Sequence, residues 1–280
     1  MISLNLKRFR YILLFFCIPV LLASCQVSGK DSVSQVASDV NQWVALTLQS
    51  FDAQRTQTAA FSFRETADKQ SVAVEVTQSA VTPSPSPWNS SEELPEEHYI
   101  WNIWGHRQFY AIGCEAATVQ DWAKYFGVDI HEANFQFQLP ISDNPDYGFV
   151  GVVTDPWGQV PPYSYGVHVY PVANLLRSNY GIPAWGLKGF TLDQLKAEIS
   201  ANRPVIAWVI GNVVGGVPYD YVDQSGRKVV VAAYEHTVIV TGFNESTIRY
   251  MNNGRFYDIP TEIFENSWAV LGNMVVIWEG

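Results

Sequence analysis

The stretch Gly113-Cys114-Glu115-Ala116-Ala117 decides the fold, because it sets a cysteine at the predicted start of a helix. The chain has three cysteines, and the other two, Cys17 and Cys25, lie in an N-terminal segment that we expect to be removed or lipidated. Cys114 is therefore left without a disulfide partner. Such a cysteine is either an inert core residue or a reactive nucleophile, and the surroundings of Cys114 favour the nucleophile.

The helix is predicted to begin at Cys114 and to stop at Gly127, where a glycine suits a C-terminal cap. It has one apolar stripe, formed by Val119, Trp122, Ala123 and Phe126. The first turn of a helix favours negative charge, because its N–H groups are unpaired and the macrodipole is positive there. This position is expected to lower the pKa of the Cys114 thiol, and Glu115 is expected to oppose that effect slightly.

The segments after this helix predict an α+β fold. Two further helices are predicted over residues 171–178 and 192–201, the second opened by Thr191. Strand-like runs follow, over residues 204–210, 228–233, 237–243, 247–251 and 274–278. Helices followed by neighbouring strands that short turns connect are typical of α+β domains with an antiparallel sheet. Residues 98–280 are long enough for one such domain.

His236 is the strongest candidate for the base that a nucleophilic cysteine needs. It precedes the strand 237–243, and a turn at residues 244–246 leads into the return strand 247–251. Folding this hairpin about residue 245 brings Asn252 roughly opposite His236 and Thr237, to within a residue or two. The Asn252 side chain would then hold the imidazole in the tautomer that abstracts a proton, as in Cys-His-Asn triads.

Gln108 lies six residues before Cys114 and is the fourth candidate. Its amide N–H₂ group, placed beside the backbone N–H of Cys114, would stabilise the oxyanion of a tetrahedral intermediate. The other histidines of this region, His106, His131 and His168, are assigned to the surface or the core. Their spacing shows no zinc-ligand pattern, so no metal and no cofactor is predicted.

Taken together, these residues resemble the papain-like cysteine peptidases, and most closely the branch of bacteriocin leader-processing (double-glycine) peptidases. The resemblance extends over residues 108–278 and includes the motifs at 148–151, 165–168, 204–209 and 235–242. It implies a papain-like fold, in which an N-terminal helix carrying Cys114 packs on an antiparallel sheet carrying His236 and Asn252. It also implies that Cys114 is the nucleophile, His236 the base and Gln108 the oxyanion donor.

The third member of the triad departs from the pattern of that branch. The branch usually carries Asp, often followed by Pro, where this chain has Asn252-Asn253. Papain is similar to this chain in using Asn. Asn266-Ser267-Trp268 resembles the Asn-Ser-Trp of papain, but Asn266 lies 30 residues beyond His236 and past the adjacent hairpin strand. Asn252 is favoured, and Asp258 and Asn266 are the alternatives.

The N-terminus predicts a bacterial lipoprotein. Residues 1–24 form a signal peptide with a basic start and an apolar stretch too short to span a membrane comfortably. Leu22-Ala23-Ser24-Cys25 resembles the lipoprotein cleavage box, which implies diacylglycerol and a fatty acyl group such as palmitate on Cys25. Residues 25–97, which include the stiff run Pro83–Pro87, are predicted to be a spacer or a small accessory segment. The predicted location is the extracytoplasmic face of a cell membrane.

The negative net charge of the chain limits the kinds of molecule that it is expected to bind. The chain has a formal net charge of −10, and removal of residues 1–24 leaves 14 basic and 27 acidic residues, a net charge of −13. So acidic a chain is not expected to bind nucleic acid. The predicted function is that of a monomeric, membrane-anchored cysteine peptidase acting on peptides or proteins. The alternatives are a non-catalytic substrate-binding lipoprotein on the same fold, and a peptidyl transferase or cell-wall amidase.

Overall fold

The structure, a computed structural model, describes residues 94–279. The predicted signal peptide at 1–24, the lipidation site Cys25 and nearly all of the predicted spacer at 25–97 lie outside the described residues. Among the described residues, no helix is both long enough and apolar enough to cross a membrane.

Two strands form the centre of the main sheet, β3 (Val205–Ile210) and β6 (Glu235–Phe243). Every residue of both strands is buried, because the sheet is covered on both faces. The two strands pair antiparallel, from Val205 opposite Val240 to Ile210 opposite Glu235. An unbroken apolar run such as Val205–Ile210 is the pattern expected of a strand buried on both faces.

The main sheet has seven strands in the order β2-β9-β3-β6-β7-β8, with β1 also paired to β6. Every strand pairing in it is antiparallel. The strands around the centre are β1 (His98–Tyr99), β2 (Ala184–Leu187), β7 (Thr247–Asn252), β8 (Arg255–Pro260) and β9 (Val275–Trp278). A separate two-stranded sheet consists of β4 (Pro218–Val222) and β5 (Lys228–Ala232). The predicted α+β class is confirmed.

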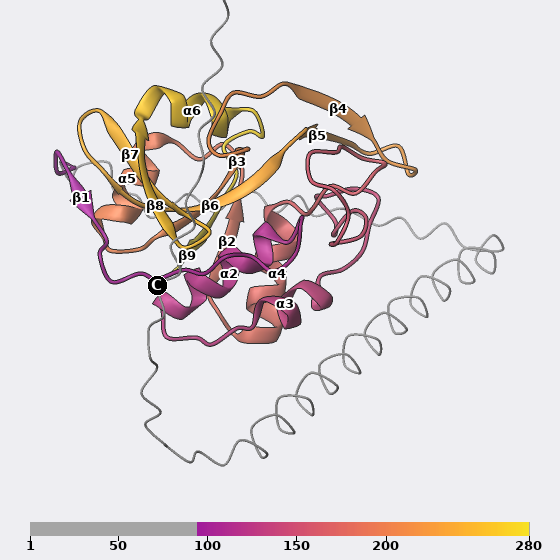
Figure 1. Cartoon of the computed structure of the whole chain (residues 1–280), viewed down its shortest axis with the longest axis horizontal. Coiled ribbons are helices and arrows are strands. Elements are labelled where there is room, and N and C mark those ends of the chain that lie inside the picture. The colour runs from indigo at the N-terminus through magenta and orange to yellow at the C-terminus, as the bar shows by residue number, and fades with distance from the viewer. Residues whose placement is uncertain (1–93, 280) are drawn as a thin grey trace, which may run out of the picture. The chain divides into compact units, whose positions relative to one another are not determined.

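Helices cover the main sheet, with α2, α3 and α4 gathered below it and α6 above it in the view of Figure 1. Their bounds are α2 (Cys114–Tyr125), α3 (Glu132–Gln138), α4 (Val169–Tyr180), α5 (Leu192–Ser200) and α6 (Thr261–Ala269). Helix α2 contacts β6 and β3, and so stands directly on the central strands. The sequence therefore places Cys114 at a helix end that the sheet itself supports.

The predicted apolar stripe of α2 faces the core. Val119, Trp122 and Ala123 are fully buried, and the Trp122 indole N–H donates to the carbonyl of Pro204 at 2.7 Å. Phe126, just past the end of the helix, stacks on Trp278 of β9 with ring centroids 4.2 Å apart. Burial of large apolar groups on one face holds the helix, and with it Cys114, in a fixed position over the sheet.

The β6–β7 hairpin forms as predicted, but its register differs. Met251 lies opposite Ile239, and the pairing shifts at a bulge between Val240 and Gly242. Asn252 therefore comes in line with Val238, one to two residues from its predicted position roughly opposite His236 and Thr237. The bulge puts one extra residue on β6, and so brings Asn252 one residue nearer to His236 than an unbroken ladder from the Phe243–Ile248 pair would.

Candidate active site

Cys114 is the first residue of α2, directly after the N-cap Gly113. Its thiol is free, and the residue is only 3% exposed. One turn further along, Thr118 Oγ1 lies 2.9 Å from Thr237 Oγ1, which ties α2 to β6 at the position next to His236. The helix start and the strand start are thus held side by side.

His236 and Asn252 are joined by a hydrogen bond of 2.9 Å between His236 Nε2 and Asn252 Oδ1. The orientation of the Asn252 amide is fixed, because its Nδ2 donates to Asn212 Oδ1 at 3.0 Å. An amide oxygen only accepts, so Nε2 of His236 carries the proton and Nδ1 keeps its lone pair. The bulged hairpin brings these side chains together even though their backbones are not directly opposite.

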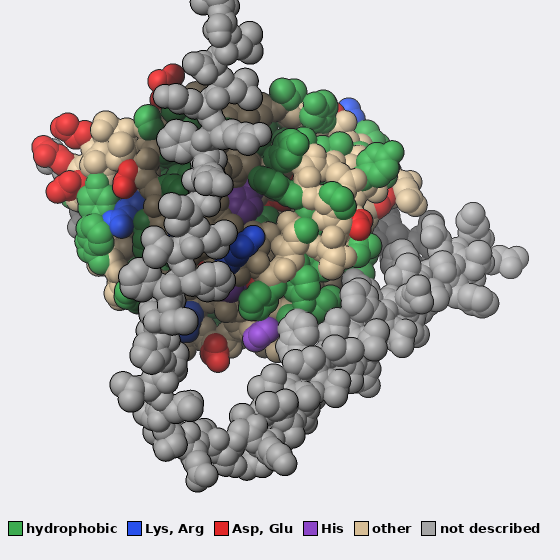
Figure 2. Space-filling view, in the orientation of Figure 1, with side chains coloured by type: hydrophobic (Ala, Val, Ile, Leu, Met, Phe, Trp, Pro, Cys, Tyr) green, Lys and Arg blue, Asp and Glu red, His purple; other side chains and the backbone are tan. Residues whose placement is uncertain are grey.

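One cleft of about 720 Å³ is lined by all four predicted site residues, Gln108, Cys114, His236 and Asn252. Its walls are rich in aromatic and polar side chains, which include Phe109, Tyr110, Trp157, Asn212 and Tyr257. On the face shown in Figure 2, hydrophobic side chains gather most densely on the side of β4 and β5. Tyr219 in β4 is exposed, as are Val217 and Tyr234, which lie beside these strands in the sequence. Asp258 and Asn266 are exposed elsewhere, on β8 and α6, and do not line the cleft.

Trp157 shields the histidine. Its indole N–H donates to the carbonyl of Glu235 at 2.8 Å, and its ring meets His236 edge-on with centroids 5.7 Å apart. The sequence analysis did not identify this role, because the link joins a loop to a strand 78 residues away. Trp208 and Trp268, by contrast, are fully buried in the core, where their indole N–H groups donate to the carbonyls of Val167 and Met274.

Gln108 is turned onto its own loop. Its Nε2 donates to the carbonyl of Tyr110 at 2.8 Å and to that of Ala111 at 3.3 Å. Its backbone N–H donates to Asn253 Oδ1 at 2.9 Å, and Asn253 Nδ2 donates in turn to Asn252 Oδ1 at 2.9 Å. Asn253 therefore connects the loop of Gln108 to the partner of His236, a role that the sequence analysis missed.

His106 holds the other end of this loop. Its Nδ1 lies 2.7 Å from Asp121 and its Nε2 lies 2.9 Å from Glu132, and Glu132 also accepts from the N–H of Phe109 at 2.9 Å. Burial lowers the pKa of His106, but hydrogen bonds to Asp121 and Glu132 outweigh it and raise the pKa above its usual value. His106 is thus a structural histidine that anchors the segment carrying Gln108.

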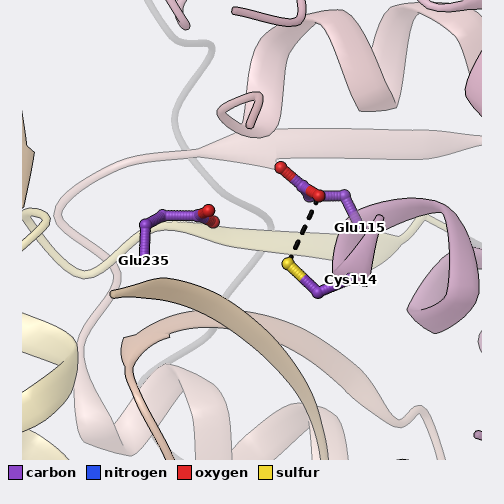
Figure 3. Close-up of side chains that lie close together, drawn as sticks. All are labelled: Cys114, Glu115 and Glu235. Carbon is purple, nitrogen blue, oxygen red and sulfur yellow. Dashed lines mark hydrogen bonds between the residues drawn. The ribbon is translucent and has the colours of Figure 1, made fainter. Parts of the chain in front are cut away.

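The electrostatics of Cys114 differ from the expectation. Burial, followed by the negative charges of Glu115 and Glu235, raises the pKa of the thiol well above its usual value. The predicted lowering is wrong, because the helix start is buried and a second carboxylate, Glu235, faces it from β6. In Figure 3 the thiol points to Glu115, to whose Oε2 it donates at 3.3 Å.

The imidazole is also neutral in this arrangement. Burial lowers the pKa of His236, and the hydrogen bond to Asn252 offsets part of that effect. A neutral thiol beside a neutral imidazole with a free Nδ1 can react by general-base transfer of the thiol proton at the moment of attack. The site does not need a pre-formed thiolate for this chemistry.

Solved structures with a similar fold include a C39-like peptidase from Bacillus anthracis, with a TM-score of 0.59 and 19% identity, covering 66% of this chain and 98% of that chain. They also include xylellain, a cysteine protease from Xylella fastidiosa (TM-score 0.41, 10% identity, 67% of this chain and 87% of that chain). Digestive procathepsin L 3 of Tenebrio molitor has a TM-score of 0.39 and 11% identity, covering 67% of this chain and 70% of that chain. At these identities the likeness is one of fold.

A comparison with curated proteins gave no match. A family model does match: residues 99–276 fit the model of the Peptidase_C39 like family. The match includes the helix of Cys114, the hairpin of His236 and Asn252, and the first two residues of β9. The fold is that of the papain-like cysteine peptidases, and the chain belongs to the Peptidase_C39 like family.

Proposed function

We propose that the protein is a cysteine peptidase, anchored by lipid on Cys25 to the extracytoplasmic face of a membrane, that hydrolyses peptide bonds. In it Cys114 is the nucleophile, His236 the base and then the acid, Asn252 the residue that orients His236, and Gln108 the oxyanion donor. The observation that carries the proposal is the 2.9 Å hydrogen bond between His236 Nε2 and Asn252 Oδ1 beside the same cleft as Cys114.

The reaction follows from these positions. His236 Nδ1 takes the proton from Cys114 Sγ as the sulfur forms a bond to the peptide carbonyl carbon. The oxyanion is stabilised by the Cys114 N–H and by the amide of Gln108, which exchanges its contacts with Tyr110 and Ala111 for the substrate. The C–N bond then breaks while His236 returns the proton to the amine. Water, deprotonated by His236, finally releases the acid from the thioester.

Peptide substrates suit the cleft walls. Phe109, Tyr110, Trp157 and Tyr257 offer aromatic surface along the cleft that contains Cys114. Aromatic side chains with a few placed polar groups are the usual lining of sites that bind largely apolar ligands. An extended peptide with apolar side chains next to the scissile bond is therefore the substrate class that the cleft favours.

The test compares Cys114→Ala and Cys114→Ser with the unaltered protein on a library of peptides. Both variants are expected to fold, since Cys114 is small and buried, and to hydrolyse peptides only at the background rate. Labelling by a thiol-directed epoxide is expected in the unaltered protein alone. Hydrolysis at an unchanged rate in Cys114→Ala would contradict the assignment of the nucleophile.

A non-catalytic peptide-binding protein is the second candidate, and one observation favours it. The Cys114 thiol donates to Glu115, and burial together with two carboxylates raises its pKa, which opposes thiolate formation. This candidate predicts that Cys114→Ala binds peptides as tightly as the unaltered protein and that neither cleaves them. Hydrolysis by the unaltered protein, lost in the variant, excludes it.

A further inference from the structure

Three side chains that could bind a metal ion converge beside the cleft. Cys114 and Glu115 come from the start of α2 and Glu235 from the start of β6. Figure 3 shows the two carboxylates pointing toward each other and the sulfur below the Glu115 carboxylate, so that the three groups form a triangle. The sulfur and one oxygen of each carboxylate all lie within 4.8 Å of one another. The sequence brings them together only through the fold, because Glu235 is 120 residues from Glu115.

The cluster is buried, and no basic side chain within residues 94–279 forms an ion pair with its carboxyl groups. Cys114, Glu115 and Glu235 are 3%, 0% and 2% exposed. Glu235 Oε1 has no hydrogen-bond partner within residues 94–279. Of the ion pairs in this part of the chain, none includes Glu115 or Glu235. Burial raises the pKa of Glu115 to about 7, and burial together with the charge of Glu115 raises the pKa of Glu235 well above its usual value. Buried carboxyl groups need compensation by a proton, a cation or hydrogen bonds, and a cation can replace the protons held here. The unpartnered oxygen Glu235 Oε1 leaves a position for such a cation.

The surrounding backbone shapes a cradle for the carboxylates. Glu115 Oε1 accepts from the N–H of Val167 at 2.5 Å, which leaves Oε2 directed to the thiol. A Cβ atom at Gly166 would lie 2.5 Å from Glu115 Oε1 and 2.9 Å from Glu235 Oε2. Only a residue without a side chain leaves room there for both carboxylates. One ligand group is therefore oriented by the backbone, as metal ligands commonly are.

We propose that Cys114 Sγ, Glu115 and Glu235 form a binding site for a divalent transition-metal ion, with Zn²⁺ as the representative ion. On binding, the thiol proton and the protons held by the Glu115 and Glu235 carboxyl groups leave to solvent, and metal–sulfur and metal–oxygen bonds take their place. One thiolate and two carboxylates carry three negative charges, which a divalent ion reduces to one. No electron transfer is involved.

The ligand set selects among metals. Zn²⁺ accepts thiolate and carboxylate ligands at about 2.0–2.3 Å, and a site with three protein ligands leaves a fourth position for water. The three ligand atoms already lie within 4.8 Å of one another. Small side-chain movements are therefore enough to place all three at these distances from one metal ion. Mg²⁺ and Ca²⁺ prefer oxygen ligands and gain nothing from the sulfur, so they are expected to bind far more weakly.

The site also regulates catalysis, and this second part rests on the proposed peptidase function. A metal ion bound to Cys114 Sγ occupies the lone pair that attacks the substrate. Zn²⁺ is then a reversible inhibitor, and a chelator restores activity. Zinc bound only between Cys114 and His236 would inhibit as well, but it would not depend on Glu235.

The test measures metal binding in the absence of substrate, so that its outcome is independent of peptidase activity. The full chain is titrated with Zn²⁺ by competition against a chromogenic chelator. We expect one tight site in the unaltered protein and at least a tenfold weaker one in Glu235→Gln and in Cys114→Ser. The matched control is Glu198→Gln, which removes a carboxylate that is also buried, but on α5 and paired with Arg203, and which is expected to bind Zn²⁺ normally.

A second readout protects the test against misfolded variants. Co²⁺ in place of Zn²⁺ is expected to give a sulfur-to-metal charge-transfer absorption in the unaltered protein, and excess Zn²⁺ is expected to abolish it. No tight Zn²⁺ site, no such absorption, or equal Zn²⁺ affinity in the folded Glu235→Gln variant would each overturn the proposal. Tight binding that depends on Glu235 in a protein that cleaves no peptide would uphold the metal site and reject the proposed peptidase function.

Discussion

Asn252 shows how much a single side chain controls in this cleft. Its Oδ1 accepts from His236 and from Asn253, while its Nδ2 donates to Asn212. One amide therefore sets both the orientation of the imidazole and the position of the loop of Gln108, which Asn253 contacts. The proposed orienting residue, Asn252, and the proposed oxyanion donor, Gln108, are coupled through two neighbouring asparagines.

Replacement of Asn252 is expected to lower activity without unfolding the protein. Asn252→Ala removes the acceptor at His236 Nε2, and a misplaced base costs about 10²-fold in rate. Peptide hydrolysis by purified variants measures this effect. Asn266→Ala is the matched control, since Asn266 is exposed on α6. If Asn266→Ala lost about 10²-fold in the rate of hydrolysis and Asn252→Ala lost none, the third triad member would be Asn266 and not Asn252.

A negative charge at position 252 is expected to shift the pH dependence of peptide hydrolysis. Asn252→Asp places a carboxylate beside His236, whose pKa is lowered by burial, and an adjacent negative charge raises the pKa of an imidazole. The base must be neutral to accept the thiol proton, so the acid limb of kcat/KM is expected to move to higher pH. The profile is measured with a peptide substrate, and an unmoved acid limb would argue against His236 as the base.

Gly166 is expected to tolerate no side chain. Gly166→Ala brings a Cβ within 2.5 Å of Glu115 Oε1, at a backbone φ of +132°. Overpacking of a tight site costs about 1–3 kcal/mol in the free energy of unfolding. Gly127→Ala is the control, because Gly127 also has positive φ but nothing lies within 4 Å of its Cβ position. Urea denaturation compares them, and equal losses would mean that only backbone strain matters.

At the level of elements, the segment 105–110 is a loop held at three points. His106 contacts Asp121 of α2 and Glu132 of α3, Phe109 contacts Glu132, and Gln108 contacts Asn253 beyond β7. Since this loop has no regular secondary structure, these contacts are what keep Gln108 near Cys114. Two helices and a hairpin thus jointly position Gln108, the proposed oxyanion donor.

The contribution of His106 to stability is expected to depend on pH. Its pKa is raised in the folded protein, so the folded state binds the proton more tightly than the unfolded chain does. That contribution is fully present below about pH 6.5, the usual pKa of histidine, and is lost as pH rises through the raised value. His106→Gln should therefore be most destabilising at acidic pH. Urea denaturation at acidic and alkaline pH tests this, and an equal loss at both would contradict it.

The elements that were predicted from sequence are those with a strong local signal. Helix α2 has an apolar stripe and Gly127 after it, and α5 has a complete capping box formed by Thr191 and Gln194. The short elements α3, β2, β4, β8 and α6 were not predicted. In α3 only seven residues are helical, and β4 is almost entirely exposed, so neither shows a periodicity that a sequence could reveal.

The four residues of the candidate site were predicted from the sequence, but the side chains that surround and orient them were not. Gln108, Cys114, His236 and Asn252 line one cleft as a set, because each lies in or beside a recognisable motif. Asn212, Trp157 and Glu235 act through contacts between segments far apart in sequence, and no local pattern marks such contacts. The pKa of the Cys114 thiol was predicted in the wrong direction for the same reason, since Glu235 reaches it only in the fold.

At the scale of the whole molecule, the described domain is expected to work at a membrane. The predicted lipid on Cys25 precedes the described domain by 68 residues or more, and that part of the chain lies outside the described residues. Acyl chains contribute about 0.8 kcal/mol for each buried CH₂ group, so two or three of them would retain the protein at a bilayer irrespective of its net charge.

Removal of the lipid site is expected to change location but not chemistry. Exchange of residues 1–25 for an ordinary secretory signal peptide without a lipidation cysteine should move the protein from the membrane fraction to the soluble extracytoplasmic fraction, because no acyl chain is then attached. The specific activity on soluble peptides should stay within about twofold, since Cys25 is remote in sequence from the cleft. Fractionation and a peptide assay measure both. A variant that remains in the membrane fraction would contradict the lipoprotein prediction.

The order of Glu235 and His236 at the start of β6 has a consequence for how this protein can evolve. Successive residues of a strand point to opposite faces, so a slip of one residue would exchange the carboxylate with the imidazole. Six consecutive pairs with β3, from Glu235 to Val240, oppose such a slip. Insertions or deletions should therefore be tolerated in the turn at residues 244–246 and be eliminated within 235–240. Directed evolution of this protein would change its substrate by altering cleft walls such as Phe109 or Trp157 long before it changed the length of this strand.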